Sequence, residues 1–359
     1  MKQITVMVTG VGGGGHGEQI LKALRLAETN YQIIAGDMSQ YSKGLLEADY
    51  AYILPPANDP SYLDVVLKVC KKHNVSALFH GSEPELRVMS AAQERIRSAG
   101  IFLPINPPAV ISLCMNKVDT CDFLKAKGFC VSSYRRIISI NDLETFDRIP
   151  AVLKPSIGGG GSANVFLAQS SEELMNFGKY MLSLYSEFIV QEYVGTPNTE
   201  FTVGVLIGMD GELLNSIAIR RDIMSSLSNR IKVPNRTGRP DLGPVLALSS
   251  GISQGEVDHY TEVTAPCEQI AMALGARAAI NIQCRLIDGK VYVFEINPRF
   301  SGTTSLRAML GYNEPDTLIR KHLFGENIRP RFSYRRGIIA RGLSEVNMEG
   351  HNFLIASEL

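Results

Sequence analysis

Short apolar runs alternate with segments of helical periodicity over the first part of the chain. The apolar runs read ITVMVTG, YQIIAGD, YAYILPP and VSALFHGS, and apolar positions recur at helical spacing over about 17–28, 61–73 and 84–98. This alternation predicts a parallel sheet that is covered by helices on both faces and binds ligands at the carboxyl ends of its strands. We therefore predict an α/β unit that ends at the proline-rich stretch FLPINPP.

The pattern changes after this stretch, because several predicted strands now follow one another directly. Helical periodicity extends over 109–128, 171–185 and 254–274. The strand-like runs AVLKPS, FIVQEYV, EFTVGVLIG and ELLNSIAIR lie between these helices. Two further runs, AAINIQCRLI and KVYVFEIN, are joined by Asp288-Gly289, which is a strong hairpin signal. This half of the chain is therefore predicted to be α+β with antiparallel strand pairs.

Composition excludes several classes of protein. The 359 residues carry a formal net charge of zero and are 45% hydrophobic, so no basic surface for nucleic acid is indicated. No apolar run approaches the ~20 residues of a membrane span, and the first strand begins too early for a signal peptide. The six cysteines include no C-x-x-C pair, which favours reduced, buried thiols. We expect a cytoplasmic protein that binds neither nucleic acid nor a membrane.

A glycine-rich loop, TGVGGGGHG (Thr9 to Gly17), connects the first strand to the first helix. Such a loop lets the backbone approach a phosphate at a helix N-terminus, and Asp37 follows where a ribose-binding acid would stand. Taken alone, these features favour an NAD-dependent oxidoreductase. However, five of the six residues from Gly12 to Gly17 are glycine, so the dinucleotide-binding spacing is matched almost by default.

The predicted hairpin around Asp288-Gly289 carries the clearest candidate chemistry. Side chains alternate between the faces of a strand, so Glu295 and Asn297 point the same way, and Gln283 can lie across from them. Carboxylate and amide oxygens suit a hard cation such as Mg²⁺, which also binds phosphates. Arg299 follows on the same face and can neutralise charge on a transferring phosphoryl group.

A second glycine-rich loop lies in VLKPSIGGGGSANV, between two predicted strands. A Walker A loop precedes a helix, so this context is different. A glycine hairpin of this kind can fold over phosphates and donate backbone N–H groups, while Lys154 supplies a point charge. The alternative is a simple glycine-rich turn.

The order of these motifs resembles the ATP-grasp superfamily, and in particular carbamoyl phosphate synthetase large subunits, biotin carboxylase and small carboxylate–amine ligases. The matching elements cover roughly residues 3 to 325. The resemblance implies a Rossmann-like domain over 1–106, a small subdomain with a glycine-rich flap over 107–190 and a large subdomain with a metal site over 191–330. The tail, 331–359, has no assignable pattern.

The resemblance also implies roles for individual residues. The expected nucleotide contacts are Lys117, Lys154, Gly159, Gly160, Gly161, Ser162, Gln191, Glu192, Tyr193, Val194 and Glu200. The expected metal ligands, for Mg²⁺ or alternatively Mn²⁺, are Gln283, Glu295 and Asn297, and the expected catalytic residues are Arg299 and Lys154. Many family members have Asp or Glu where this chain has Gln283, whereas the carbamoyl phosphate synthetase branch tolerates glutamine there, so we interpret Gln283 as a marker of that branch. An amide oxygen coordinates but contributes no charge, which leaves the number of bound metal ions open.

The activity implied by the resemblance is an ATP-dependent ligation through an acyl phosphate. A small carboxylate takes the γ-phosphoryl group, an amine then displaces phosphate, and a homodimer is expected by analogy with the family. Three alternatives remain: an enzyme that releases the acyl phosphate itself, a non-catalytic ATP-binding regulatory module, and the NAD-dependent oxidoreductase.

Candidate substrate contacts are weaker predictions. They are Gly15, His16, Glu83, Arg220 and Arg307. Arg220 and Arg221 are neighbours on a predicted strand, so only one of them faces the cleft. An arginine on that face would suit a carboxylate or phosphate, whereas the alternative for each is a solvated surface side chain.

Overall fold

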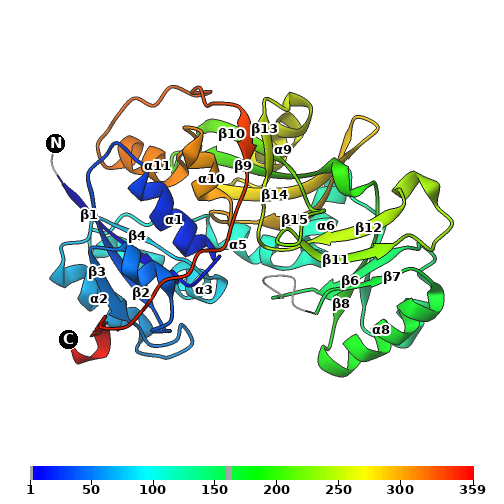
Figure 1. Ribbon diagram of the computed structural model, residues 1–359, viewed down its shortest axis with the longest axis horizontal. Coiled ribbons are helices and arrows are strands. Elements are labelled where there is room, and N and C mark those ends of the chain that lie inside the picture. The colour runs from blue at the N-terminus through cyan, green and yellow to red at the C-terminus, as the bar shows by residue number, and fades with distance from the viewer. Residues whose placement is uncertain (1–2, 159–163) are drawn as a thin grey trace.

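A parallel sheet forms the N-terminal unit (Figure 1). The computed structural model describes residues 3–158 and 164–359. The strand order is β17-β3-β2-β1-β4, and all neighbours are parallel. The strands are β1 (Ile4–Thr9), β2 (Tyr31–Asp37), β3 (Tyr50–Ile53), β4 (Ala77–Phe79) and β17 (Leu354–Ile355). The helices are α1 (His16–Arg25), α2 (Tyr62–Lys72), α3 (Glu83–Ala91) and α4 (Gln93–Ser98). The predicted α/β unit is therefore confirmed.

The alternation of side chains along β1 explains why helices cover both faces of this sheet. Val6 and Val8 belong to the apolar core that contains α1, whereas Met7, between them, belongs to the core that contains α2. Both faces of the strand are therefore buried, as expected of a parallel sheet between two helical layers.

Two antiparallel sheets form the rest of the chain, as the sequence predicted. The smaller has the order β5-β8-β6-β7, and the larger has the order β15-β14-β9-β10-β13-β16. The strands of the smaller sheet are β5 (Tyr134–Ile137), β6 (Ala151–Pro155), β7 (Phe166–Ala168) and β8 (Phe188–Glu192). The strands of the larger sheet are β9 (Glu200–Ile207), β10 (Leu213–Arg221), β13 (Gly255–Asp258), β14 (Ala278–Ile287), β15 (Lys290–Asn297) and β16 (Gly337–Ile339).

Helices cover these sheets, and a separate hairpin connects them. The helices are α5 (Pro108–Met115), α6 (Lys117–Ala126), α7 (Ile140–Glu144), α8 (Ser171–Leu184), α9 (Thr261–Ala273), α10 (Thr304–Met309) and α11 (Glu314–His322). The hairpin strands are β11 (Asn229–Pro234) and β12 (Val245–Ser249). The large sheet and the N-terminal unit share one apolar core, in which Leu214 and Ile217 of β10 join Ile20 of α1 through Leu318 of α11.

Three predicted helices are corrected by the structure. The helix expected over 84–98 is interrupted at Ala92, between α3 and α4. The helix expected over 109–128 is broken at Asn116, whose side chain accepts hydrogen bonds from the N–H groups of Val118 and Asp119 and so starts α6. The helix expected over 254–274 begins only at Thr261. The preceding segment is β13, because it pairs with β10 and β16, which are distant in sequence.

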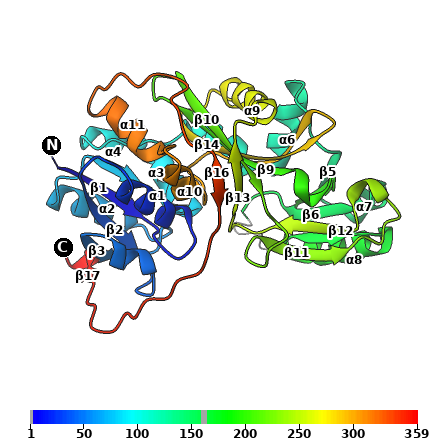
Figure 2. The same cartoon turned by 45° about the horizontal axis from the view of Figure 1, so that its top comes forward.

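The C-terminal tail connects the two ends of the molecule. It leaves the large sheet as β16, passes along the molecule and adds β17 to the edge of the N-terminal sheet (Figure 2). The side chain of Ala356 is fully buried against the core around α2. The tail, which the sequence left unassigned, therefore joins the large sheet through β16 and packs on the N-terminal unit through β17 and Ala356.

Among residues 3–158 and 164–359, no helix combines the length and apolar character needed to cross a membrane.

Docking of the tail can be tested by placing a charge at its buried residue. We expect Ala356→Glu to lower the free energy of unfolding by about 1–3 kcal/mol, because the carboxylate either overpacks the core or releases the tail. Denaturant unfolding measures this change, and Ser357→Glu, which adds the same charge at an exposed neighbour, is the control. Equal stability of the two variants would contradict the packing of Ala356.

Candidate functional site

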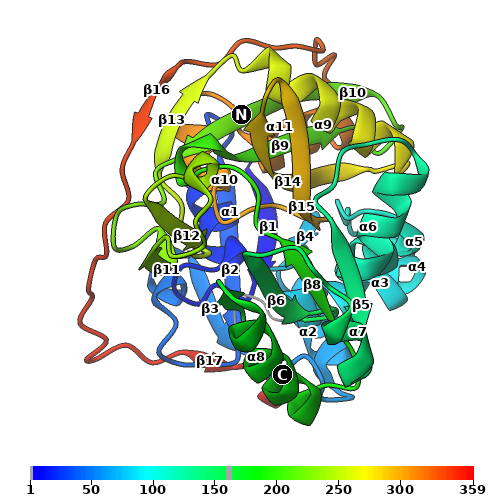
Figure 3. The same ribbon diagram turned by 90° about the vertical axis from the view of Figure 1, so that its right-hand side faces the viewer.

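A cleft lies between the small sheet and the large sheet, which Figure 3 shows next to one another. It encloses about 1260 Å³ of empty space, including the part open to solvent. Its lining includes Lys117, Lys154, Gln191, Glu192, Tyr193, Val194, Glu200, Gln283, Glu295, Asn297 and Arg299. These are all the predicted nucleotide, metal and catalytic residues except Gly159 to Ser162, which lie outside the described residues.

The hairpin of β14 and β15 places the predicted metal ligands on one face. Gln283 pairs with Glu295, as the sequence predicted, and Asn281 pairs with Asn297. Asp288 and Gly289 have φ angles of 50° and 73°, the left-handed conformation that a tight hairpin turn requires. The turn sets the register from Ile287 with Lys290 to Cys284 with Val293, and a one-residue shift between Gln283 and Cys284 then places Gln283 opposite Glu295.

The donor set of this face fits a hard cation that also binds phosphate. Glu295 supplies a carboxylate, and no hydrogen bond or ion pair to it is found within the described parts of the chain. Amide oxygens of Gln283 and Asn297 lie beside it. Those parts contain no group of three or more His, Cys, Asp or Glu side chains arranged to hold a metal. This set is suited to Mg²⁺, which keeps water and phosphate ligands, and not to a fully protein-bound metal.

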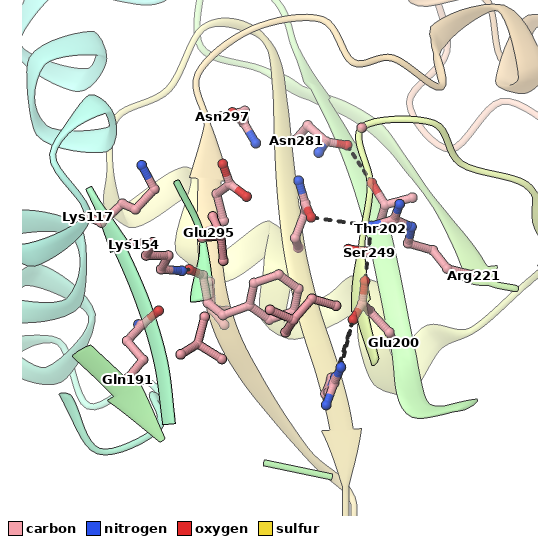
Figure 4. Close-up of a pocket in the computed structure, with 18 of the residues that line it drawn as sticks. Lys117, Lys154, Gln191, Glu200, Thr202, Arg221, Ser249, Asn281, Glu295 and Asn297 are labelled. Atoms are coloured by element: carbon pink, nitrogen blue, oxygen red, sulfur yellow. Dashed lines mark hydrogen bonds and ion pairs between the residues drawn. The ribbon is translucent and has the colours of Figure 1, made fainter. Parts of the chain in front are cut away.

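Two lysines face this cluster from the small-subdomain side (Figure 4). Lys117 donates to the carbonyl oxygen of Gly158 over 2.9 Å, and Lys154 donates to that of Phe294 over 2.9 Å. Burial lowers the pKa of Lys154 to about 8, with Glu295 opposing and Lys117 adding to the shift. The ammonium group of Lys154 is therefore a desolvated cation that an anionic ligand would stabilise.

The opposite wall of the cleft contains a buried ion triad. Glu200 accepts from Arg221 over 3.0 Å and from the Nη2 atom of Arg285 over 3.1 Å, and all three side chains are 5% exposed or less. Burial lowers the pKa of Arg221, and Glu200 opposes that shift. Arg285 also donates to the carbonyl oxygen of Val194 and lies 4.3 Å from the ring centre of Tyr193. The triad thus connects the predicted adenine-binding segment to the large sheet.

Arg221 and Arg285 are site residues that the sequence analysis did not select. Arg285 is brought opposite Glu200 by the register of β14 on β9, two strands far apart in sequence, so the sequence carried no signal for it. For Arg221, the sequence indicated only that one of the neighbours Arg220 and Arg221 faces the cleft. The predicted candidate, Arg220, is wrong: it is exposed, pairs with Glu256 and does not line the cleft. Arg221 is the one that faces the cleft.

Arg307 is also wrong as a direct substrate contact. Its side chain is completely buried, pairs with Glu314 over 3.1 Å and donates to Asn281 Oδ1 over 2.7 Å. Because Asn281 lines the cleft, Arg307 supports the wall of the cleft from behind. Its position after the metal-binding strand suggested a ligand, but the helix α10 turns the side chain into the core.

Glu83 does reach the cleft, and it forms an ion pair with Arg299 over 3.3 Å. His16 is buried beside His80, with Nε2 and Nδ1 separated by 3.3 Å, and neither histidine lines the cleft. Burial and then the charge of Arg299 hold the pKa of His80 near 3. Both rings are therefore neutral packing groups at the junction with the N-terminal unit, and Gly15 only caps α1.

The first glycine-rich loop has a packing explanation. A Cβ atom on Gly17 would lie 2.3 Å from the carbonyl oxygen of Gly10, and one on Gly81 would lie 2.1 Å from that of Thr9. These glycines let β1, β4 and α1 approach one another closely. The loop is not part of the lining of the cleft.

Comparisons with known proteins agree with this geometry. A family model described as PylC-like, N-terminal domain, matches residues 8–104, and one described as ATP-grasp in the biosynthetic pathway with Ter operon matches residues 247–341. A search of curated protein sequences found no match.

Several solved structures share the fold. An L-amino acid ligase from Bacillus licheniformis is 18% identical, with a TM-score of 0.62 over 92% of this chain and 78% of that one. An ADP complex of N5-carboxyaminoimidazole ribonucleotide synthetase is 16% identical, with a TM-score of 0.61 over 89% and 76%. A biotin carboxylase from Campylobacter jejuni is 14% identical, with a TM-score of 0.61 over 88% and 70%.

The fold is therefore that of an ATP-grasp protein. The match of an ATP-grasp family model to residues 247–341 agrees with the resemblance that the motifs predicted.

The importance of the ion triad for folding can be measured. We expect Glu200→Gln to lower the free energy of unfolding by about 3–5 kcal/mol, because it leaves two buried guanidinium groups without a counterion. The control is Glu256→Gln, which removes the exposed pair with Arg220 and should cost less than about 1 kcal/mol. Similar losses in the two variants would show that the triad is not a buried, desolvated network.

Proposed function

We propose that this protein is an ATP-dependent ligase that activates a small carboxylate as an acyl phosphate and joins it to an amine. The observation that carries the proposal is the carboxylate of Glu295, which has no hydrogen-bond or ion-pair partner within residues 3–158 and 164–359. It shares with Lys117, Lys154, Arg221 and Arg299 the cleft that the predicted nucleotide-binding motifs line. A lone carboxylate among cations is suited to a metal ion that carries phosphates.

The nucleotide would lie along the cleft from the triad to the hairpin. The segment Gln191 to Val194 would face the adenine, and Glu200 would lie near the ribose. Glu295 and Asn297, with the amide of Gln283 beside them, would hold Mg²⁺. When bound, the metal ion neutralises charge on the phosphates. Lys117 and Lys154 approach the phosphates from the other side.

Arg299 is positioned to act on the transferring phosphoryl group. Its Nη2 donates to Asn297 Oδ1 over 3.0 Å and to Glu83, and its buried Nε has no acceptor within the described parts of the chain. A carboxylate of the substrate attacks the γ-phosphorus, the bond to the β-phosphate oxygen breaks, and ADP leaves. Arg299 stabilises the charge that spreads over the phosphoryl oxygens in this step.

The second step is displacement of phosphate by an amine. The acyl phosphate hydrolyses readily, so the protein must exclude water while the amine attacks the acyl carbon. The predicted flap at Gly159 to Ser162 is suited to this role. The acid would occupy the end of the cleft at Arg299, where Ser301, Gly302 and Ser253 also line the wall.

The proposal predicts phosphate release that depends on both substrates. MgATP is incubated with a panel of amino acids, small carboxylates and amines, and products are identified by mass spectrometry. One acid with one amine should stimulate release, and Glu295→Ala should reduce the rate by roughly 10²–10³-fold or more. Glu256→Ala, which removes an exposed carboxylate, should retain the activity.

Other outcomes separate the alternatives. Tight ATP binding without stimulated turnover would favour a regulatory module. Hydroxamate formation with hydroxylamine, but no amide with any amine, would favour an enzyme whose product is the acyl phosphate. Binding of NAD in the absence of ATP binding would mean that the first glycine-rich loop is a dinucleotide site and that the proposal is wrong.

Nucleotide affinity should fall at alkaline pH through Lys154. In the free protein this lysine loses its charge as the pH rises through about 8, whereas bound phosphates favour the charged form and raise its pKa. The Kd for an ATP analogue should therefore rise above pH 8, by at most about tenfold per pH unit for one proton. Calorimetric titration at pH 7 and 9 measures this effect.

The control for this experiment is Lys154→Arg, which stays charged over the whole range. Its affinity should be lower overall but nearly constant with pH. An unchanged pH dependence in this variant would assign the titration to another group.

A further inference from the structure

Two arginines flank Glu295 in a similar way. Arg299 donates to the amide oxygen of Asn297 over 3.0 Å and pairs with Glu83. Arg221 donates to the amide oxygen of Gln283 over 3.5 Å and pairs with Glu200. Each guanidinium group is thus attached to one carboxylate and to one amide that adjoins Glu295.

Both arginines retain a hydrogen-bond donor for a ligand. The Nε atoms of Arg221 and Arg299 are buried, and neither has an acceptor in residues 3–158 and 164–359. An unsatisfied buried donor is costly, so each of these groups is a candidate for an anionic oxygen that enters with a ligand. For Arg299 this need is met by the proposed phosphoryl contact. The buried Nε of Arg221 also has no acceptor within the described residues, and no contact proposed above supplies one.

Arg221 is held in a fixed position. Its Nη2 donates to the carbonyl oxygen of Ser250 over 2.7 Å, its Nη1 bonds Glu200, and the side chain is 2% exposed. Glu200 must also neutralise Arg285, so two guanidinium groups share one carboxylate. Within this triad the two guanidinium groups exceed the carboxylate by one positive charge, and Glu295 is the next negative group that acts on Arg221.

This positive charge disfavours a second metal ion beside Gln283. A divalent cation at that position would approach Arg221, and Gln283 provides no negative charge to offset the repulsion. Glu295 is the one carboxylate on this face of the hairpin within the described residues. One divalent cation is matched by one carboxylate, whereas a second cation is not.

We propose, resting on the proposed function, that the site takes a single divalent cation at Glu295 and that Arg221 contacts the nucleotide phosphates in place of a second cation. Gln283 then serves to orient Arg221. Gln283 and Arg221, an arginine that the sequence analysis did not select, would thus act together in place of a second metal site.

The direct test is to count metal ions in the wild-type protein. The protein is titrated with Mn²⁺ at a saturating concentration of a non-hydrolysable ATP analogue, and bound and free Mn²⁺ are measured by electron paramagnetic resonance. We expect one tightly bound Mn²⁺ per protein molecule in the ternary complex. Two would overturn the inference and leave the proposed ligase intact, whereas failure to bind the nucleotide at all would overturn both.

Two sets of variants test the role of Arg221 itself. Arg221→Met should raise the Kd of the analogue at least tenfold, whereas Arg220→Met, on the same strand but facing away, should leave it within twofold. The double variant Arg221→Gln with Gln283→Glu removes the fixed charge and restores a carboxylate, so it should bind a second Mn²⁺. Unchanged affinity in Arg221→Met, or one Mn²⁺ in the folded double variant, would contradict the proposed role. Circular dichroism confirms that each variant is folded.

Discussion

The carboxylate of Glu200 accepts hydrogen bonds from both Arg221 and Arg285, and this buried triad fixes one wall of the cleft. Arg285 reaches from this carboxylate to the carbonyl oxygens of Val194 and Gly195, while Arg221 reaches to Ser250 and Gln283. One buried anion therefore connects β9, β10 and β14 with the loop that precedes β9 and the loop that follows β12. Because these charges are desolvated, each needs the others, and the geometry of the cleft depends on all three.

The parts of the site that the sequence predicted are those fixed by local structure. Alternation along β15 placed Glu295 and Asn297 on one face, and the Asp288-Gly289 turn identified β14 as the partner strand. The one-residue register shift that puts Gln283 opposite Glu295 was not readable from the sequence. The triad is different, because it depends on pairing between strands that are far apart in sequence. On β10, Ile217, Ala218 and Ile219 are all buried, so alternation gave no sign of which arginine faces the cleft.

The same reasoning applies to the fold. The order of strands and helices was readable because their apolar runs are long and periodic. The strands β13, β16 and β17 have 4, 3 and 2 residues, too few to show a period, and they exist because a neighbouring edge pairs with them. A short segment whose structure is set by its partner cannot be assigned from its own residues.

The packing also indicates which part of the molecule can move when the cleft closes. The N-terminal unit and the large sheet share one apolar core, and the tail connects them a second time through β16 and β17. The small sheet has its own core and touches the rest through fewer groups, among them the bond from Lys154 to Phe294 and the apolar cluster of Leu246 with Tyr193. Separation of the cores favours closure by rotation of the small sheet against a rigid remainder. The cations then fall into two sets: Lys154 lies on the small sheet, whereas Arg221 and Arg299 stay with the part that holds Glu295. Lys117 starts α6, which packs on the core of the large sheet through Leu124.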